Sequence, residues 1–401
     1  MLNAYIYDGL RSPIGRHGGV LASIRPDDLA AEIIKKLIEK TGIPGADIED
    51  VILGDTNQAG EDSRNVARMA VLLAGLPVTV PGQTVNRLCA SGLGAIIDSA
   101  RAITCGEGDV YIAGGVESMT RAPFVMGKAE TAFSRETKIF DTTIGSRFPN
   151  KKITAQYGGH SMPETGDNVA VEFGITREQA DTFAAQSQAK YQQAKTEGFF
   201  EGEITPIEVS QGKKLPPKLV SEDEHPRPSS NFEALSKLKP LFEGGVVTAG
   251  NASGINDGAA ALLIGSETVQ EKYGLKPMAK ILSAAAAGIE PRIMGAGPIE
   301  AIKKAVSRAG LTLDDMDIIE INEAFASQVL SCLKGLDLDF NDPRVNPNGG
   351  AIAVGHPLGA SGARLTLTVA RELQRRQKKY AVVSLCIGVG QGLAMVIENV
   401  S

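Results

Sequence analysis

Two segments of this chain repeat each other, and the repeat constrains the fold more than any other feature. Residues 88–103 (LCASGLGAIIDSARAI) match residues 358–373 (LGASGARLTLTVAREL) at an offset of 270, sharing Leu, Ala, Ser, Gly, Ala and Arg. Upstream, residues 50–59 (DVILGDTNQA) match residues 315–324 (DMDIIEINEA) at an offset of 265. Because the matched blocks follow the same order, the sequence predicts two copies of one structural unit.

Short apolar runs alternate with helical patterns along most of the chain. The runs lack polar alternation, which is typical of strands covered on both faces. They are residues 50–54, 109–114, 259–265, 318–321 and 380–385, and helical patterns bounded by Gly or Pro cover 26–41, 64–75 and 299–310. This alternation predicts an α/β fold with mainly parallel sheets.

The segment between the two copies, residues 120–242, differs in character. It holds clusters of Pro, Lys, Glu and Ser and one clear helical pattern, residues 176–196. Apolar anchors remain in it, so we interpret it as an inserted cap or loop domain rather than a linker. Covers of this kind exclude water from a site.

Charge and cysteine spacing exclude several classes of function. The net charge is −6 and no basic block is present, which argues against nucleic-acid and anionic-membrane partners. Without a signal peptide or a membrane-length apolar run, we expect a cytoplasmic protein. The four cysteines form no CxxC pair, which excludes a zinc ribbon and a disulfide-dense scaffold. We expect no metal and no permanently bound cofactor.

Cys89 is the first candidate for chemistry. It follows an expected strand, residues 83–85, and precedes a helix of small residues. Amide groups at a helix N-terminus stabilise an anion, so the sequence predicts a thiol with a lowered pKa near neutral pH. A buried structural cysteine is the alternative interpretation.

His356 and Cys386 lie in tight, glycine-rich backbone. His356 precedes the second copy of the repeated helix and could activate a nearby thiol, or it could be a capping histidine satisfied by backbone. Cys386 ends an expected strand and enters a turn whose amides could bind an oxyanion. That turn reads GxGxG rather than GxGxxG, so we reject a dinucleotide site. Ser91 and Ser361 lie outside GxSxG, which argues against a serine triad.

Two polar segments complete the candidates. Asn322 in NEAF could hold a water or a carbonyl oxygen, or could simply begin a helix. The loop 249–258 (AGNASGINDG) could fold around a pantetheine chain or a phosphate. Ligands bind at the carboxyl ends of strands in parallel α/β sheets, so we expect the two halves to bring Cys89 opposite His356 and Cys386.

In chain order, NRLCASG, NASGINDGAAA, NEAF, NPNGGAIAVGHPLGASGAR and CIGVGQG resemble the signature blocks of the thiolase family. The resemblance covers residues 5–398. It implies a five-layered α-β-α-β-α sandwich of two duplicated halves, residues 1–272 and 273–401, with a loop domain at 120–245 inserted in the first. It also implies a homodimer or homotetramer that takes small-molecule acyl-CoA substrates.

The resemblance also implies a role for each candidate. Cys89 would carry the acyl group as a thioester, His356 would activate Cys89, and Cys386 would be the acid and base at the acetyl carbon. Asn322 would hold a water that forms one oxyanion site with His356, and the amides of Cys89 and Gly388 would form the second. Coenzyme A, the co-substrate, would meet Arg227 and Ser253 in a channel lined by Phe242, Ala249, Ala324 and Phe325. Val389 replaces the usual middle glycine of CIGGGQG, which narrows that turn.

Other blocks narrow the expected substrate. Ser161 replaces the histidine of the His-Met-Gly block of short-chain members, and Met162 would face the acyl pocket. SMPET, AGEDSRNVARMA and RAPFVMGKA resemble members that act on 3-oxoadipyl-CoA in the β-ketoadipate pathway of aromatic degradation. We therefore expect thiolysis of that substrate by a ping-pong mechanism. Its distal carboxylate requires a cation near the pocket; the candidates are Lys128, Arg135, Lys138, Arg147 and Lys151.

Three alternatives remain open at the level of sequence. The chain could be a general acetyl-CoA C-acetyltransferase that acts on acetoacetyl-CoA. Ketoacyl synthases share the fold, but Cys386 argues against them. A non-catalytic acyl-CoA-binding protein is disfavoured because Cys89, His356 and Cys386 are all present.

Overall fold

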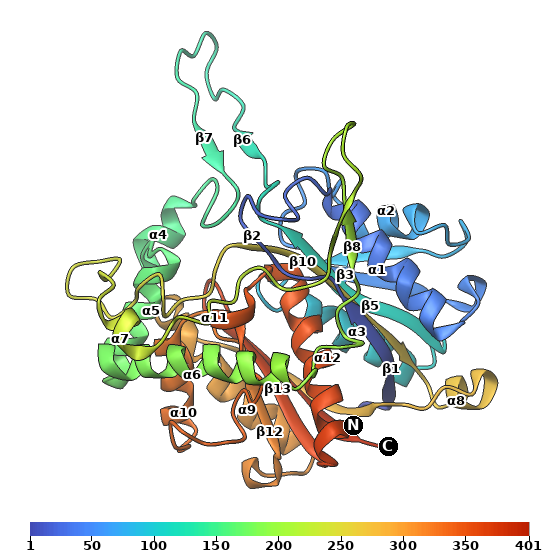
Figure 1. The fold of residues 1–401 in the computed structure, drawn as a ribbon. Coiled ribbons are helices and arrows are strands. Elements are labelled where there is room, and N and C mark those ends of the chain that lie inside the picture. The colour runs from blue at the N-terminus through green and yellow to red at the C-terminus, as the bar shows by residue number, and fades with distance from the viewer. Residues whose placement is uncertain (401) are drawn as a thin grey trace.

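The computed structural model describes residues 1–400 (Figure 1). The first half contains β1 (Ala4–Arg11), β2 (Gly15–Arg16), α1 (Pro26–Thr41), β3 (Asp50–Gly54), α2 (Val66–Leu73), β4 (Gly82–Val85), α3 (Ser91–Thr104), β5 (Val110–Ser118) and β10 (Asn256–Gly265). After α8 (Thr268–Tyr273), the second half contains β11 (Ala279–Gly288), α9 (Gly297–Arg308), β12 (Ile318–Ile321), α10 (Ala326–Gly335), α11 (Ala351–Val354), α12 (Leu358–Arg376), β13 (Tyr380–Ile387) and β14 (Gln391–Asn399).

A long insertion separates β5 from β10. It comprises β6 (Phe124–Met126), β7 (Ile139–Asp141), α4 (Lys151–Tyr157), α5 (Met162–Phe173), α6 (Arg177–Thr196), β8 (Ile207–Val209), β9 (Lys218–Val220) and α7 (Phe232–Ser236). The predicted boundary between residues 272 and 273 falls within α8, and the division into two domains stays a prediction. Within residues 1–400, none of the helices has the length and apolar character needed to cross a bilayer.

The two halves repeat one strand order, in agreement with the sequence repeat. The first half runs β4-β3-β5-β10-β1 and the second runs β12-β13-β14-β11, while a single parallel bridge from Ile319 to Val345 stands in the place of β4. In the first half β4, β3 and β5 are parallel, and β10 is antiparallel to both of its neighbours. In the second half β12 and β13 are parallel, and β14 is antiparallel to both of its neighbours. A short antiparallel pairing of β1 with β11 joins the halves into one ten-stranded sheet.

The prediction of mainly parallel sheets is therefore wrong, because both half-sheets are mixed. The reason is visible in the β13–β14 connection, which consists of residues 388–390 alone. A connection of this length can form a hairpin, whereas a parallel crossover needs a dozen or more residues.

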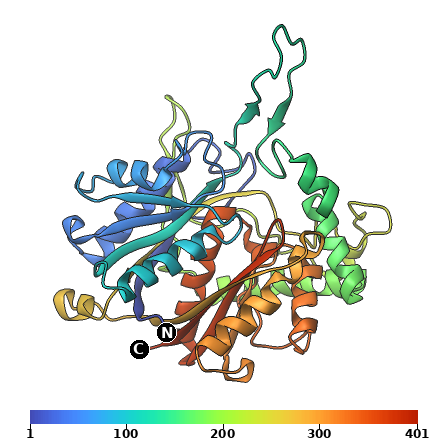
Figure 2. The same ribbon diagram turned by 180° about the vertical axis from the view of Figure 1, so that it is seen from behind.

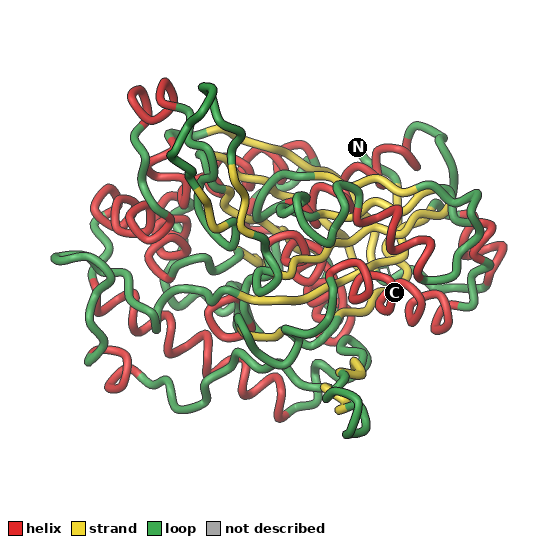
Figure 3. Tube along the Cα trace, turned by 90° about the horizontal axis from the view of Figure 1, so that it is seen from above, coloured by secondary structure: helices red, strands yellow, loops and turns green. Residues whose placement is uncertain are grey.

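The predicted five-layered sandwich is confirmed. Helices α1 and α2 pack on the outer face of the first half-sheet, and α9 and α10 pack on the outer face of the second. Helices α3 and α12 fill the space between the half-sheets, where apolar side chains from both halves form one cluster. Figure 2 shows the two halves side by side from behind, and Figure 3 shows the strands in the middle with helices on the flanks.

The contact between α3 and α12 depends on glycine. A Cβ on Gly92 would lie 2.6 Å from the carbonyl oxygen of Gly359, and a Cβ on Gly362 would collide with the backbone of Leu93. The first turns of the two helices therefore touch backbone to backbone. Since Cys89 and His356 each precede the first residue of a helix by two positions, this contact brings their two segments to the same place.

Several elements match the sequence-based expectation residue for residue, and others escape it. The ranges expected at 26–41, 50–54 and 318–321 coincide with α1, β3 and β12. Strands β1, β11 and β14 were not expected, because their polar and alanine-rich stretches lack a continuous branched run. The insertion also holds α4, α5 and α7 beside the single helix that its sequence indicates.

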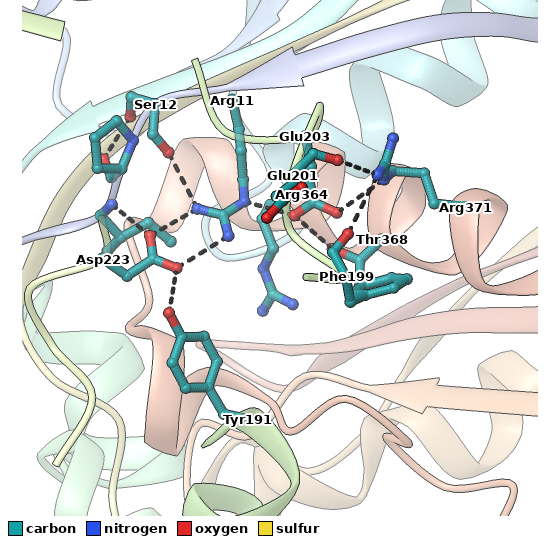
Figure 4. Close-up of polar contacts among 12 residues, drawn as sticks. Arg11, Ser12, Tyr191, Phe199, Glu201, Glu203, Asp223, Arg364, Thr368 and Arg371 are labelled. Atoms are coloured by element: carbon teal, nitrogen blue, oxygen red, sulfur yellow. Dashed lines mark hydrogen bonds and ion pairs between the residues drawn. The ribbon is translucent and has the colours of Figure 1, made fainter. Parts of the chain in front are cut away.

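A buried network of charges fixes the insertion to both halves (Figure 4). Arg11 on β1 donates from Nε to Glu203 (2.6 Å) and from both terminal nitrogens to Asp223 (2.7 and 3.0 Å). Tyr191 on α6 donates to Asp223, and Thr368 on α12 donates to Glu203. Burial alone would lower the pKa of Arg11, but the two carboxylates raise it. Because breaking a buried pair leaves an uncompensated charge, this network resists separation of the insertion from the core.

The helix contact makes a prediction about stability. Gly92→Ala should lower the free energy of unfolding by about 1–3 kcal/mol, because the new Cβ overlaps the Gly359 carbonyl. Gly94→Ala is the matched control, since its Cβ has nothing within 4 Å, and it should stabilise α3 by about 0.5–1 kcal/mol. Thermal or urea unfolding of both variants checks this. Equal effects of the two substitutions would contradict the proposed contact.

Candidate active site

Cys89 lies in a strained turn between β4 and α3. Leu88, just before it, has a φ of +47°, which is unusual for a residue with a side chain. Two hydrogen bonds hold the turn: Leu88 N–H donates to Asn86 Oδ1 (2.9 Å), and Ser91 Oγ donates to the Leu88 carbonyl (2.6 Å). Backbone strain of this kind is concentrated at functional sites. Ser91 therefore fastens the turn that presents the sulfur.

The Cys89 thiol is largely shielded from solvent and faces two amide groups. Its residue is 6% exposed, and the backbone N–H groups of Gly388 and of Cys89 itself are within hydrogen-bonding reach of the sulfur. Burial raises the pKa of Cys89 to about 11, although both amides act to lower it. The prediction of a lowered pKa is thus wrong for the free protein, because desolvation of the thiolate outweighs the helix and amide dipoles.

His356 is buried, and its hydrogen bonds define its tautomer. Ser361 Oγ lies 2.6 Å from His356 Nδ1 and itself donates to the Pro357 carbonyl (2.8 Å). Since the hydroxyl proton is used for that carbonyl, we assign the imidazole proton to Nδ1, which leaves a lone pair on Nε2. Burial, reinforced by the charge of Arg364, lowers the pKa of His356 to about 3. The histidine is therefore a neutral base.

Asn322 faces this lone pair. Its Nδ2 lies 3.3 Å from His356 Nε2, and its backbone N–H donates to Ser384 on β13. Phe325, rather than Asn322, is the N-cap of α10, so the helix-capping interpretation of Asn322 is wrong. Its Oδ1 is buried and has no hydrogen-bond partner in the described residues. The amide is thus available to orient a polar atom beside the imidazole.

Cys386 is fully buried at the end of β13. It belongs to an apolar cluster with Val247, Met294, Ala324 and Phe325, against which Met162 packs. Burial raises the pKa of Cys386 well above its usual value, and the nearby Cys89 raises it further. The charge of a Cys89 thiolate therefore acts on Cys386, and the predicted meeting of the two thiols stays a prediction. Cys386 is a protonated thiol in the free protein.

The turn after Cys386 faces the nucleophile. A Cβ on Gly388 would lie 3.3 Å from Leu88 Cδ1 and 3.9 Å from the Met162 sulfur, so this glycine lies between those two side chains. Val389 has a φ of +65° and is 63% exposed. The narrowed turn expected from Val389 is thus a strained one. The strained residue directly follows Gly388, whose backbone amide approaches Cys89.

The residues expected to meet coenzyme A fall into two groups. Ser253 donates its backbone N–H to the Ala324 carbonyl (2.9 Å), which holds the AGNASG loop against NEAF and the Cys386 cluster. The other three are exposed: Arg227, whose backbone N–H is held by Gln188 Oε1 (2.9 Å), Phe242 and Ala249. They lie on the outer side of the site, and the structure brings none of them into the thiol cluster. Their roles stay predictions.

Two positioning residues escaped the sequence-based reasoning. Asn256 accepts the His356 backbone N–H (2.9 Å) through Oδ1 and donates to the Gly15 carbonyl. Glu117 accepts from Gly359 N (2.9 Å) in the first turn of α12 and from Thr56 and Asn57. Asn256 lies in the NASGINDGAAA block, but nothing in that block points to a contact with His356, and no local motif marks Glu117. Ser361 did carry a signal, since it repeats Ser91, but its contact with the histidine depends on the fold.

A thiol beneath two amides, a neutral imidazole and a second thiol together define a site for acyl transfer through a thioester. In residues 1–400, no group of His, Cys, Asp and Glu is arranged to hold a metal ion. Comparison with known proteins agrees with that class. The chain matches the thiolase N-terminal domain over residues 4–268 and the thiolase C-terminal domain over residues 275–399. It belongs to the thiolase family and is an acyltransferase.

Individual relatives are similar over their whole length. The 3-oxoadipyl-CoA/3-oxo-5,6-dehydrosuberyl-CoA thiolase of Escherichia coli K12 is 56% identical over 402 residues, with 100% of both chains covered. Among solved structures, the acetyl-CoA acetyltransferase of Bacillus anthracis has a TM-score of 0.93 at 38% identity, with 100% and 99% covered. Human mitochondrial 3-ketoacyl-CoA thiolase in complex with CoA has a TM-score of 0.91 at 39% identity, with 99% and 98% covered.

The raised pKa of Cys89 predicts how its alkylation depends on pH. Only the thiolate reacts, and at a pKa of about 11 its fraction grows about tenfold per pH unit between pH 7 and 10. The rate of iodoacetamide labelling should therefore rise without a plateau in that range. The measurement uses a Cys105→Ser background, because Cys105 is exposed, and mass spectrometry to locate the adduct. A plateau below pH 9 would show that the amides outweigh desolvation.

Proposed function

We propose that this protein cleaves 3-oxoadipyl-CoA with coenzyme A to give succinyl-CoA and acetyl-CoA. The observation that supports the proposal is the contact of α3 with α12 at Gly92 and Gly359, which places the segments of Cys89 and His356 together. The Gly388 amide and Cys386 act on Cys89 from the end of β13. The 56% identical relative named for 3-oxoadipyl-CoA supports the substrate. The β-ketoadipate pathway of aromatic degradation is the context in which such a substrate arises.

The first step is attack of the Cys89 sulfur on the 3-oxo carbonyl. His356 Nε2 takes the thiol proton, because Ser361 holds the imidazole proton on Nδ1 and the basic lone pair is therefore on Nε2, next to Asn322. The amides of Cys89 and Gly388 donate to the oxygen on which charge develops, and each such donor typically contributes about 3 kcal/mol to transition-state stabilisation.

The second step breaks the bond between C2 and C3. The electron pair moves to C2 and gives the enolate of acetyl-CoA, whose oxygen would accept hydrogen bonds from the water held by Asn322 and from protonated His356. Cys386 donates its proton to C2, and acetyl-CoA leaves while the succinyl group stays on Cys89. A thiol with a raised pKa is protonated and ready for this donation.

The third step returns the enzyme to its starting state. The thiol of a second coenzyme A loses its proton, attacks the Cys89 thioester and releases succinyl-CoA. Cys386 takes the proton that coenzyme A loses, and protonated His356 returns its proton to the Cys89 thiolate that leaves the thioester. Coenzyme A would approach from the side of Ser253 and Arg227, past Phe242 and Ala249. It acts as a co-substrate, and the scheme uses no permanently bound cofactor.

Mutation can separate the proposed roles of Cys89 and Cys386. Cys89→Ser should lower kcat for thiolysis of 3-oxoadipyl-CoA by at least about 10³-fold, because an alkoxide is much harder to form than a thiolate. Cys386→Ala should lose cleavage yet still accept an acetyl group from acetyl-CoA on Cys89, since that exchange forms no carbanion. Intact-mass spectrometry and a thiolysis assay check both results.

The substrate preference of the wild-type protein tests the proposed assignment of 3-oxoadipyl-CoA. A panel of 3-oxoacyl-CoA esters should show a higher kcat/KM for 3-oxoadipyl-CoA than for acetoacetyl-CoA. The reverse order would favour a general acetyl-CoA C-acetyltransferase. Full activity of Cys89→Ser would refute the acyl-enzyme mechanism, and loss of acetylation in Cys386→Ala would contradict the separate roles of the two thiols.

We also propose a homotetramer in the cytoplasm, where a reducing medium keeps both thiols free. The arm, residues 124–141, rises from the body of the molecule (Figure 1) and exposes apolar side chains, with Phe133 fully exposed at its tip. Exposed apolar patches of this kind mark association surfaces. Strand β4 is the outer strand of its half-sheet and offers a second surface, for a dimer.

Charge at the arm tip should change the oligomeric state. Phe133→Asp places a carboxylate in the proposed contact and should shift the protein from tetramer to dimer in light scattering after size-exclusion chromatography. Val171→Asp, at another exposed apolar position on α5, is the matched control and should leave the mass unchanged. An unchanged mass for both variants would remove the arm from the interface.

A further inference from the structure

Arg147, just beyond the arm, is a half-buried cation without an anionic partner. Its guanidinium donates to the carbonyl oxygens of Thr142 (3.3 Å) and Thr56 (3.2 Å), and it forms no ion pair with any carboxylate in residues 1–400. Removing a charge from water is costly unless it is paired. A positive charge that the fold holds in place without pairing it is therefore available for a ligand.

The other cations of this region differ from Arg147. Lys128, Arg135, Lys138 and Lys151 are all exposed, and surface cations of this kind gain little from pairing with an anion. Arg121 is held in an ion pair with Glu61. Of the cations suggested by the sequence, only Arg147 is both partly shielded from water and fixed in orientation by hydrogen bonds.

The position of Arg147 connects it to the nucleophile. The Thr56 carbonyl that accepts from Arg147 also accepts from Asn86 Nδ2 (3.2 Å). Asn86 Oδ1 in turn accepts the Leu88 N–H, which fixes the turn that presents Cys89. The guanidinium thus shares one acceptor with the Cys89 turn.

Nearby acids do not satisfy the charge of Arg147. Asp62 is the carboxylate whose pKa Arg147 helps to lower, but burial raises the pKa of Asp62 overall, and its Oδ1 accepts from Gly60 N–H (2.8 Å). Burial also raises the pKa of Asp55 and Glu117, which belong to the same acidic cluster as Asp62. In residues 1–400, no hydrogen bond or ion pair joins any of these carboxylates to the Arg147 guanidinium, whose hydrogen bonds go to the carbonyl oxygens of Thr142 and Thr56.

We propose that Arg147 binds the distal carboxylate of the acyl chain carried on Cys89. The inference rests on the proposed function, and it names the group that selects a dicarboxylic acyl-CoA over a neutral one. The two carbonyl acceptors hold the plane of the guanidinium and leave further N–H donors free. A planar fork of donors suits a carboxylate, which it can bind through two parallel hydrogen bonds.

Substrate pairs that differ in the terminal charge test this assignment. Arg147→Gln should raise KM for 3-oxoadipyl-CoA about 10- to 100-fold and change KM for acetoacetyl-CoA less than about twofold. Inhibition by the product succinyl-CoA should weaken similarly, while inhibition by butyryl-CoA, which lacks the carboxylate, should not. Arg147→Lys should recover part of the loss, because it restores the charge without the fork. Arg101→Gln, at an exposed position on α3, is the control for loss of one charge.

Each contrary result has a distinct meaning. Equal increases in KM for both substrates, with a lowered melting temperature, would show that Arg147 only anchors the base of the arm, and would overturn the assignment. Unchanged KM for both would overturn it as well and place the carboxylate elsewhere. If the wild-type protein fails to cleave 3-oxoadipyl-CoA, the proposed function is wrong, and the succinyl-CoA and butyryl-CoA pair still decides whether Arg147 recognises a terminal carboxylate.

Discussion

Close approach of α3 and α12 is the constraint on which the site depends. Both helices begin with small residues, and Gly92 and Gly359 let their first turns meet backbone to backbone. The segments that carry Cys89, two residues before one helix, and His356, two residues before the other, are then brought together by the core of the molecule rather than by flexible loops. Rigid elements hold reacting groups more accurately than loops do, so the fold itself carries the catalytic geometry.

The charge states of Cys89, His356 and Cys386 follow from their burial away from water. Burial keeps both thiols protonated and His356 neutral, so the resting site contains no thiolate–imidazolium pair. Proton transfer from Cys89 becomes favourable only when a substrate oxygen arrives to take up negative charge from the amides of Cys89 and Gly388. The same exclusion of water protects an enolate from stray protons and strengthens each donor aimed at it. A high pKa is therefore compatible with catalysis here.

Much of this arrangement could be predicted from sequence, and the remainder has physical reasons for escaping it. The repeat led to the duplicated halves, because matched blocks imply matched positions in two related units. The pKa of Cys89 could not be predicted, since it depends on how much protein surrounds the sulfur and not on the helix that follows it. Asn256 and Glu117 contact residues 100 and 242 positions away in the chain, where no spacing rule applies. The antiparallel direction of β14 follows from the short turn at 388–390, which the sequence did contain, whereas the long insertion before β10 gave no such signal.

The duplication also explains why the two halves contribute unlike groups. Asn57 and Asn322 occupy matched positions in the repeat, and each has a buried Oδ1 without a partner in the described residues. Asn322 faces His356 and serves the reacting end of the site, whereas Asn57 donates to Thr142 Oγ1 (3.0 Å) and holds the base of the arm. The carbonyls that orient Arg147 belong to Thr142 and to Thr56, the residue directly before Asn57. Both copies thus contribute to the proposed chemistry, but the matched asparagines differ: Asn322 lies beside His356, whereas Asn57 supports the segment that orients Arg147.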